Sequence, residues 1–210
     1  MRIRLNIVRC HMSTTVAVIA HAVPIAEIDG RLPDKYLSSL KEEDGHSVIA
    51  LSRNGRVIGT LKEIIDLLPF GADLYLLNES CILTGESLRK SCETLESILR
   101  ELEGNPGIVC RATGCSHKET TEIHSRGFKP LPATIVYPPT ARIENGWVYF
   151  YTESEVVSLL RKAQVSHDPK PPRDDEGESL EFAFSLLKSH LSLLRNAVSS
   201  EMAVVFNRYN

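Results

Sequence analysis

Residues Ser47–Leu61 read SVIALSRNGRVIGTL, and they contain the strongest local signal in the chain. Two β-rich runs, Ser47–Ser52 and Arg56–Leu61, flank Arg53-Asn54-Gly55. Asn-Gly is the favoured centre of a type I′ turn, because both of its residues tolerate a positive φ and the turn's twist matches that of paired strands. The stretch therefore predicts an antiparallel β-hairpin, and the neighbouring segments can be placed around it.

Helical periodicity dominates the segment that follows the hairpin. Gly85–Glu103 carries apolar residues at intervals of three and four, and Gly104-Asn105-Pro106-Gly107 ends the pattern. This spacing predicts a long helix with one face packed on a sheet. Shorter helices are predicted at Leu32–Leu40, Lys62–Leu68, Ser116–Arg126 and Ser154–Ala163.

A second Asn-Gly dipeptide at 145–146 predicts a second hairpin, formed by Ala141–Glu144 and Trp147–Tyr151. Alternating or continuous apolar runs predict the remaining strands. The fold class that follows is α/β, with a mixed, mostly antiparallel sheet flanked by helices. The other expected strands are Met1–Val8, Thr15–Ala22, Ala72–Leu77, Ile108–Arg111 and Phe128–Tyr137.

The C-terminal third divides into a linker and a helix. Residues 164–179 are rich in proline and acidic residues, a composition typical of linkers because it buries little apolar area. Residues 180–210 are expected to form a C-terminal amphipathic helix, with an apolar stripe from Leu180 to Val198. This stripe needs a partner surface, either the body formed by residues 1–163 or a second copy in a homodimer.

Composition limits the partners and the compartment. The chain has 210 residues, and Lys+Arg 24 against Asp+Glu 27 gives a formal net charge of −3, so no nucleic-acid partner is expected. No apolar run approaches the roughly 18 residues of a membrane-spanning helix, so no membrane partner is expected either. The cysteines are odd in number and scattered, which favours reduced thiols and a cytoplasmic protein.

The order of elements from Ser47 to Tyr137 resembles the core of the GNAT superfamily of N-acetyltransferases. Three pieces carry the resemblance, which covers about half of the chain. Val48–Gly59 (VIALSRNGRVIG) is similar to the first hairpin of the family, and Leu74–Leu77 (LYLL) to its central strand. Thr121–Pro130 (TEIHSRGFKP) is similar to the closing signature, in which a helix ends in Gly-Phe.

The resemblance implies an acetyl-CoA site where the long helix begins. In the family, a glycine-containing loop places backbone N–H groups against the pyrophosphate, and the helix dipole favours the anion. The corresponding stretch here is Asn78–Ser87, in which Gly85 is the one glycine. The implied cofactor-binding residues are Leu76, Leu77, Thr84, Gly85, Glu86, Ser87 and Arg89.

The implied activity is acyl-CoA-dependent transfer of an acetyl group to an amine on a small molecule or a protein. Ile123 occupies the position of the tyrosine that protonates the leaving thiolate in many members, and His124 beside it is the candidate replacement. Glu79, just after the central strand, is the candidate base. The loss of the tyrosine and of loop glycines leaves a second hypothesis open, a non-catalytic binding or assembly protein.

Cysteines and histidines near residue 115 form the remaining candidate site. Cys110, Cys115, His117 and His124 have the atoms of a Cys2His2 metal site, but the seven residues from His117 to His124 span two helical turns. A packed structural cysteine is the competing interpretation for Cys110, and no metal is expected. Cys115 alone lies where a helix N-terminus would lower a thiol pKa, yet no hydrolase signature accompanies it.

Overall fold

The computed structural model of the chain describes residues 2–4, 17–40, 47–50, 62–69, 80–105, 107, 108, 111, 118, 141–144, 147–151, 155, 158, 159, 162 and 180–209. The strands are β1 (Arg2–Arg4), β2 (Ala17–Pro24), β3 (Ser47–Ala50), β4 (Cys81–Leu83), β5 (Ala141–Glu144), β6 (Trp147–Phe150) and β7 (Met202–Tyr209). The helices are η1 (Ile25–Glu27), α1 (Pro33–Leu40), α3 (Gly85–Gly104) and α7 (Leu180–Ser199).

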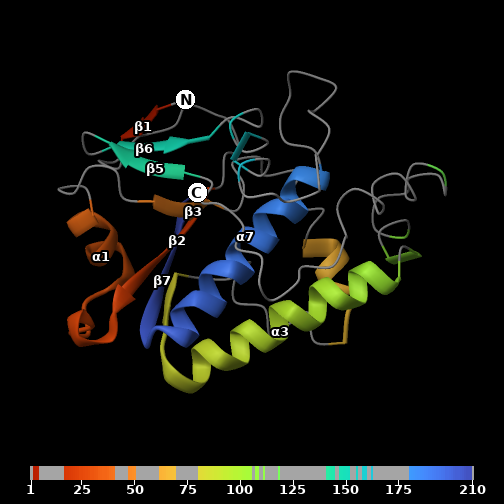
Figure 1. Cartoon of the computed structure of the whole chain (residues 1–210), viewed down its shortest axis with the longest axis horizontal. Coiled ribbons are helices and arrows are strands. Elements are labelled where there is room, and N and C mark those ends of the chain that lie inside the picture. The colour runs from red at the N-terminus through yellow and green to blue at the C-terminus, as the bar shows by residue number, and fades with distance from the viewer. Residues whose placement is uncertain are drawn as a thin grey trace.

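Within these residues the strands form a seven-stranded sheet in the order β1-β6-β5-β3-β2-β7-β4 (Figure 1). Every neighbouring pair is antiparallel. The chain is thus a mixed α/β protein with an antiparallel sheet and flanking helices, which confirms the coarse fold class predicted from the sequence.

The longest pairing joins two segments from opposite ends of the chain. β2 and β7 pair along their whole length, from Ala17 opposite Tyr209 to Pro24 opposite Met202. Ile19 is only 2% exposed, and Val204, Val205 and Phe206 are completely buried. A strand buried on both faces has a continuous apolar sequence, and AVVF at 203–206 fits that rule.

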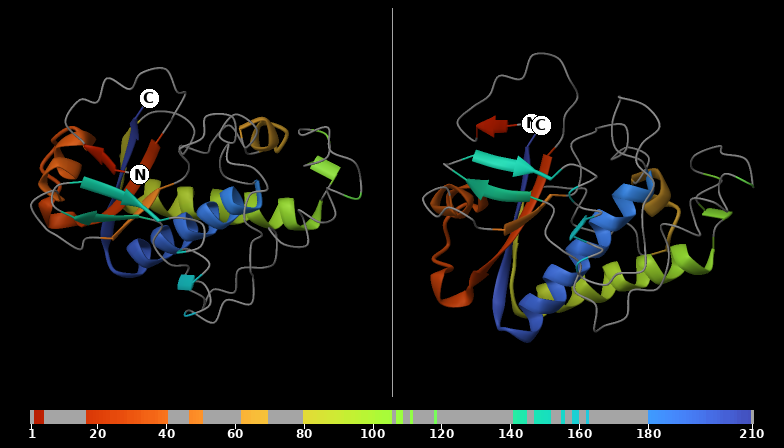
Figure 2. Two further views of the ribbon diagram at one scale, coloured as in Figure 1. Left: turned by 90° about the horizontal axis from the view of Figure 1, so that it is seen from above. Right: turned by 45° about the horizontal axis from the view of Figure 1, so that its top comes forward.

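Helices cover both faces of this central pair. Phe206 meets the ring of His190 of α7 edge-on, at 6.0 Å between centroids, whereas the next residue, Val205, packs with Tyr36 of α1. Successive residues of a strand point to opposite faces, so α7 and α1 lie on opposite sides of the sheet. α7 also packs along α3, and the two views of Figure 2 show these helices running beside each other.

The amphipathic face of α3 supplies a large part of the apolar core. Thr84 is the N-cap, and the buried positions repeat at three- and four-residue spacing as predicted. Leucines and isoleucines buried to this degree each contribute about 1.5–3 kcal/mol through area removed from water. The buried residues of α3 are Leu88, Leu95, Ile98, Leu99 and Leu102.

Several sequence predictions are confirmed. The second hairpin has the expected two-residue loop, because Glu144 pairs with Trp147 across Asn145-Gly146. α1 begins at Pro33, which supplies a preset φ at the first turn. Helix is also present at 62–66 and at the described residues of 154–163, and strands lie within Met1–Val8 and Thr15–Ala22, although β2 continues to Pro24.

Two predictions are wrong. The expected strand at Ile108–Arg111 is helical at 107, 108 and 111, because the Asn-Pro-Gly sequence that ends α3 starts another turn, in which Ile108 N–H donates to Asn105 O at 3.1 Å. The C-terminal helix does not continue to 210. It ends at Ser199, and Glu201 turns the chain at a φ of 54° into β7, which lies in the sheet interior.

The remaining predictions lie outside the described residues. They include the second strand of the first hairpin, the strands at Ala72–Leu77 and Phe128–Tyr137, and the linker at 164–179. The apolar stripe of α7 contacts α3, β7, β3 and β2 of its own chain, and the homodimer stays a prediction. Across the described helices, none combines the length and the apolar character that crossing a bilayer requires.

Candidate functional site

The predicted cofactor loop reaches α3 at Thr84 and Gly85. Cys81–Leu83 belong to strand β4 and pair with β7, so this part of the expected loop is strand instead. Thr84 continues the extended backbone, with φ −137° and ψ 156°, and Gly85 then turns the chain with a φ of 47°. Only glycine adopts such a φ readily, and apart from its chain neighbours and the backbone of α3, no atom of the described residues lies within 4 Å of the position that a Cβ would take.

The first turn of α3 carries backbone N–H groups without acceptors inside the helix. The N–H of Leu88 donates to Thr84 O at 3.2 Å, so the amides of Gly85, Glu86 and Ser87 precede the first helical bond. The Ser87 hydroxyl closes the turn, accepting from Thr84 N–H at 3.0 Å and donating to Thr84 O at 2.8 Å. Gly85, Glu86 and Ser87 are exposed residues, and the capping box pairs the Thr84 side chain with the Ser87 N–H, which leaves the amides of Gly85 and Glu86 for an anion.

Charged side chains surround this turn with a small positive balance. Glu86 lies in the first turn, and Arg89 and Lys90 follow three and four residues later. All three are exposed, and in the described part of the chain none is within 4.0 Å of an opposite charge. The carboxylate opposes an anion at the helix N-terminus, whereas the two cations attract one.

The other predicted site residues lie outside the described residues, and so do the cysteines and histidines of the alternative metal site. Among the residues that are described, no three His, Cys, Asp or Glu side chains are grouped as metal ligands. The structure therefore brings Thr84, Gly85, Glu86, Ser87 and Arg89 together at one helix end. The predicted residues that it does not place are Leu76, Leu77, Glu79, His124, Cys110, Cys115 and His117.

Two cysteines are described, and neither is an activated thiol. Cys81 in β4 is half-buried, and burial raises its pKa to about 11. Burial also raises the pKa of Cys92 in α3, although the positive charge of Arg195 acts in the opposite direction. A thiol whose pKa is raised holds little thiolate at neutral pH, so both cysteines act as small apolar residues.

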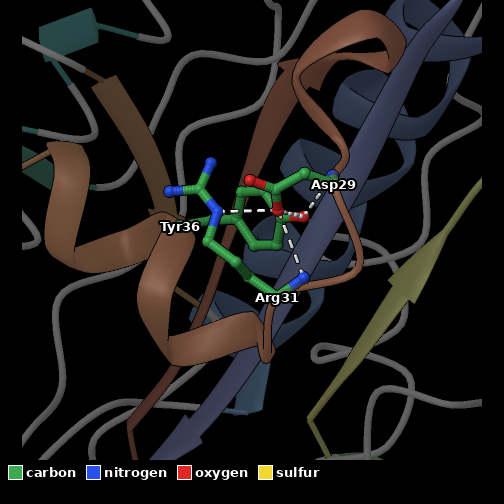
Figure 3. A network of polar contacts seen from close by, with 3 residues as sticks. All are labelled: Asp29, Arg31 and Tyr36. Atoms are coloured by element: carbon green, nitrogen blue, oxygen red, sulfur yellow. Dashed lines mark hydrogen bonds and ion pairs between the residues drawn. The ribbon is translucent and has the colours of Figure 1, made fainter.

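A polar network not foreseen from the sequence fixes the loop between β2 and α1 (Figure 3). The Tyr36 hydroxyl accepts from Asp29 N–H and donates to Asp29 Oδ1, both at 2.9 Å. The same oxygen accepts from Arg31 Nε at 2.7 Å, and the guanidinium lies 4.6 Å from the centre of the Tyr36 ring. The hydrogen bond from Arg31 lowers the pKa of Asp29, so this carboxylate is an anchor and a poor base.

Polar side chains are also buried on α7. From Leu187 to Ser192 every residue of the helix is buried, including Lys188 and His190. Burial lowers the pKa of His190 to about 3, which keeps its imidazole neutral at physiological pH. An apolar stripe predicts one buried face, and no sequence signal marked this stretch as covered all round.

One ion pair joins the two long helices. Arg195 of α7 donates from Nη2 to Glu96 Oε1 of α3 at 3.0 Å, and the two residues are 99 positions apart in the chain. Nη1 of Arg195 is buried, and no hydrogen-bond partner for it lies within the described residues. The pair therefore adds a polar contact to the packing of α7 along α3.

Searches against known protein families, against curated proteins and against solved structures find no match to this chain.

Proposed function

We propose that this chain is an N-acyltransferase-like protein that uses acyl-CoA, with the first turn of α3 as the seat of the cofactor's pyrophosphate. One observation supports the proposal: β4 leads within two residues into a 20-residue helix whose first amides are exposed. The open space at Gly85 lets a phosphate approach the backbone closely. The residues present fit the group, because the amides of Gly85 and Glu86 and two cations outweigh one carboxylate.

The roles of the residues follow from this arrangement. The amides of Gly85 and Glu86 would hold the phosphates, and the cation of Arg89 would add charge on the following turn. Acyl-CoA would supply an activated acetyl group as a thioester. In a GNAT-like fold, Glu79 would accept the proton of the attacking amine, and His124 would donate a proton to the departing thiolate.

A second candidate is a binding or assembly protein that has kept the fold and lost the chemistry. Glu86 favours it, because its carboxylate lies in the turn that would hold the pyrophosphate. The pairing of Cys81–Leu83 with β7 favours it too, since those three residues are part of the sheet and not free to wrap a ligand. This protein would keep the sheet and helices for contacts with a partner and would release no CoA.

Calorimetric titration of acetyl-CoA into the wild type and into Glu86→Gln tests the site. Removing the carboxylate should tighten binding by about three- to tenfold, because a like charge within one helical turn of the pyrophosphate is lost. Glu93→Gln is the matched control, since Glu93 is also exposed on α3 but lies almost two turns further along. Its effect should be less than twofold.

The outcomes separate the two candidates. Heat of binding together with chromatographic detection of free CoA in the presence of amines supports the enzyme. Binding without CoA release supports the second candidate. Neither a titration signal nor a rise in melting temperature with about 1 mM acetyl-CoA, in both the wild type and Glu86→Gln, refutes the cofactor site, since any ligand of the folded state stabilises it by mass action.

A further inference from the structure

The connection between α7 and β7 is a very short turn. The helix ends at Ser199 and the strand begins at Met202, so only Ser200 and Glu201 lie between them. The chain reverses its direction here, because α7 packs back against β7. The right-hand view of Figure 2 shows the two elements, both in blue, joined at the lower edge of the molecule. Two residues therefore decide where the strand goes after the helix.

This turn is strained at one residue. Glu201 has a φ of 54°, and among the described residues it is the one non-glycine residue with a positive φ. A side chain with a Cβ makes the left-handed conformation costly, which is why glycine is the usual residue just after a helix. Ser199, Ser200 and Glu201 are all exposed, so no buried packing around the turn holds it in place. The strain is the result of bringing β7 back to the sheet.

The strand itself lies deep in the protein. Residues 203–206 are completely buried, and Asn207 is 2% exposed. β7 fills the slot between β2 and β4, and it forms ladder pairs with both strands. An empty slot would expose apolar surface and unpaired backbone groups on β2 and β4, which is unfavourable. If β7 leaves, a strand with the same apolar pattern has to take its place.

A second copy of the chain carries a strand that fits this slot, because its own β7 has the same sequence. We propose that two copies of this chain exchange β7 by opening the turn at Ser200 and Glu201. Each β7 then lies between β2 and β4 of the other copy, with the registers of the monomer. The two exchanges are equivalent and form a closed two-fold dimer. In the opened turn the chain no longer reverses, so Glu201 takes a negative φ.

The balance between monomer and dimer depends on the hinge. All contacts of β7 in the monomer are repeated in the exchanged dimer, so they cancel in the comparison. A short tether holds the chain's own β7 near its slot at an effective concentration in the millimolar range. Release of the strain favours exchange by about fivefold at each hinge, or about 25-fold for the two hinges of a dimer. We therefore expect a dissociation constant on the order of 100 µM.

Size-exclusion chromatography with light scattering tests the exchange on the full chain. The protein is refolded from urea at about 10 µM and at about 500 µM, and each sample is measured over several days. The lower concentration should give the monomer, and the higher one should give mostly dimer. The two forms should interconvert slowly, because a buried strand has to leave the core first. A sample that is entirely monomeric at about 500 µM overturns the proposal.

Substitutions at the hinge separate backbone strain from charge. Glu201→Gly removes the strain in the monomer and should raise the dissociation constant about 25-fold, because each dimer contains two hinges. Glu201→Gln is the matched control, since it keeps the Cβ and removes only the charge, and it should stay within about twofold of the wild type. The side chain is exposed, so both variants should fold, which circular dichroism verifies. An equal dissociation constant for Glu201→Gly and the wild type overturns the hinge as the cause.

A disulfide between copies identifies the exchanged strand. Ala22 of β2 pairs directly with Val204 of β7, and such a pair places the two Cβ atoms within reach of a disulfide. Ala22→Cys and Val204→Cys are made in separate proteins, which are refolded together at about 500 µM and oxidised. Mass spectrometry should find a peptide pair linked between positions 22 and 204. A dimer without this link is held together by its surface or by another segment, and it overturns the exchange of β7.

Discussion

Acid should destabilise this protein in a way that depends on one residue, His190 of α7. This side chain is 1% exposed and meets Phe206 edge-on at an interplanar angle of 87°. Burial lowers its pKa from 6.5 to about 3, because the charged imidazolium loses its solvation. In the unfolded chain the same imidazole ionises near its ordinary pKa, so acid favours unfolding.

The size of the effect follows from linkage. Between pH 6.5 and about 3 the unfolded state binds a proton at His190 that the folded state does not, so stability falls as the pH is lowered through this window. Each pH unit corresponds to about 1.4 kcal/mol, which gives a loss of about 2 kcal/mol by pH 5. Above the pKa of the His190 imidazole in the unfolded chain, the contribution of this residue to stability no longer changes with pH, and the full stability is present.

Urea denaturation of the wild type and of His190→Gln between about pH 8 and pH 5 measures this term. The variant does not ionise, and the other titrating groups are common to both proteins, so they cancel in the difference. At the high-pH plateau the variant should be less stable by about 1–2 kcal/mol because its packing is poorer. The wild type should then lose about 2 kcal/mol more than the variant on going to pH 5. If the free energy of unfolding of the two proteins changes with pH in parallel, the inference that His190 is held neutral is refuted.

Three further experiments test the packing and the polar contacts. Leu95→Ala should cost about 2–5 kcal/mol in urea denaturation, whereas Leu67→Ala, at a position 49% exposed, should change stability by less than about 0.5 kcal/mol. Tyr36→Phe removes a hydroxyl that both accepts and donates, and should lower Tm in calorimetry by a few degrees. A double-mutant cycle on Arg195→Met and Glu96→Gln should give a coupling of about 1 kcal/mol, and additive effects would show that the pair contributes nothing.

The sequence predicted the elements whose signals are local. The Asn145-Gly146 turn set the register of β5 and β6, because a two-residue turn leaves only one in-phase pairing of the flanking strands. The periodicity from Gly85 and the Gly104-Asn105-Pro106-Gly107 sequence predicted the bounds of α3 for a similar reason, since both signals lie within the helix or directly after it. Such features need no knowledge of the rest of the fold.

Long-range pairing could not be predicted in the same way. Met202–Tyr209 was expected to continue the C-terminal helix, although its run AVVF is also typical of a buried strand. What selects the strand is the backbone of β2, nearly the whole chain away in sequence, which supplies the hydrogen-bond partners. The signal was present in the β-branched pair Val204-Val205, but a short apolar run alone does not distinguish strand from helix.

In the candidate cofactor site, too, the features set by local signals could be predicted and those set by long-range strand pairing could not. The start of α3 at Gly85 could be predicted, because the helical periodicity of the apolar residues is a local signal. The conformation of the residues before this turn could not be predicted in the same way. Cys81–Leu83 was expected to belong to a loop, but it forms a strand because β7 lies beside it and pairs with it. The comparison of acetyl-CoA binding by the Glu86→Gln variant and the wild type tests whether this turn holds a phosphate.

Arg2 and Arg142 illustrate why the net charge of a sequence does not predict which charged residues lie together in the fold. The net charge of −3 argues against a polyanion partner only if the charges act together, and in about 0.1 M salt charges more than about 10 Å apart are largely screened. Arg2 and Arg142 are 140 residues apart in the chain, yet both pair with Tyr149, so the sheet places them in one row. The average composition therefore constrains non-specific attraction at long range, whereas the register of β1, β6 and β5 decides which charged residues become neighbours.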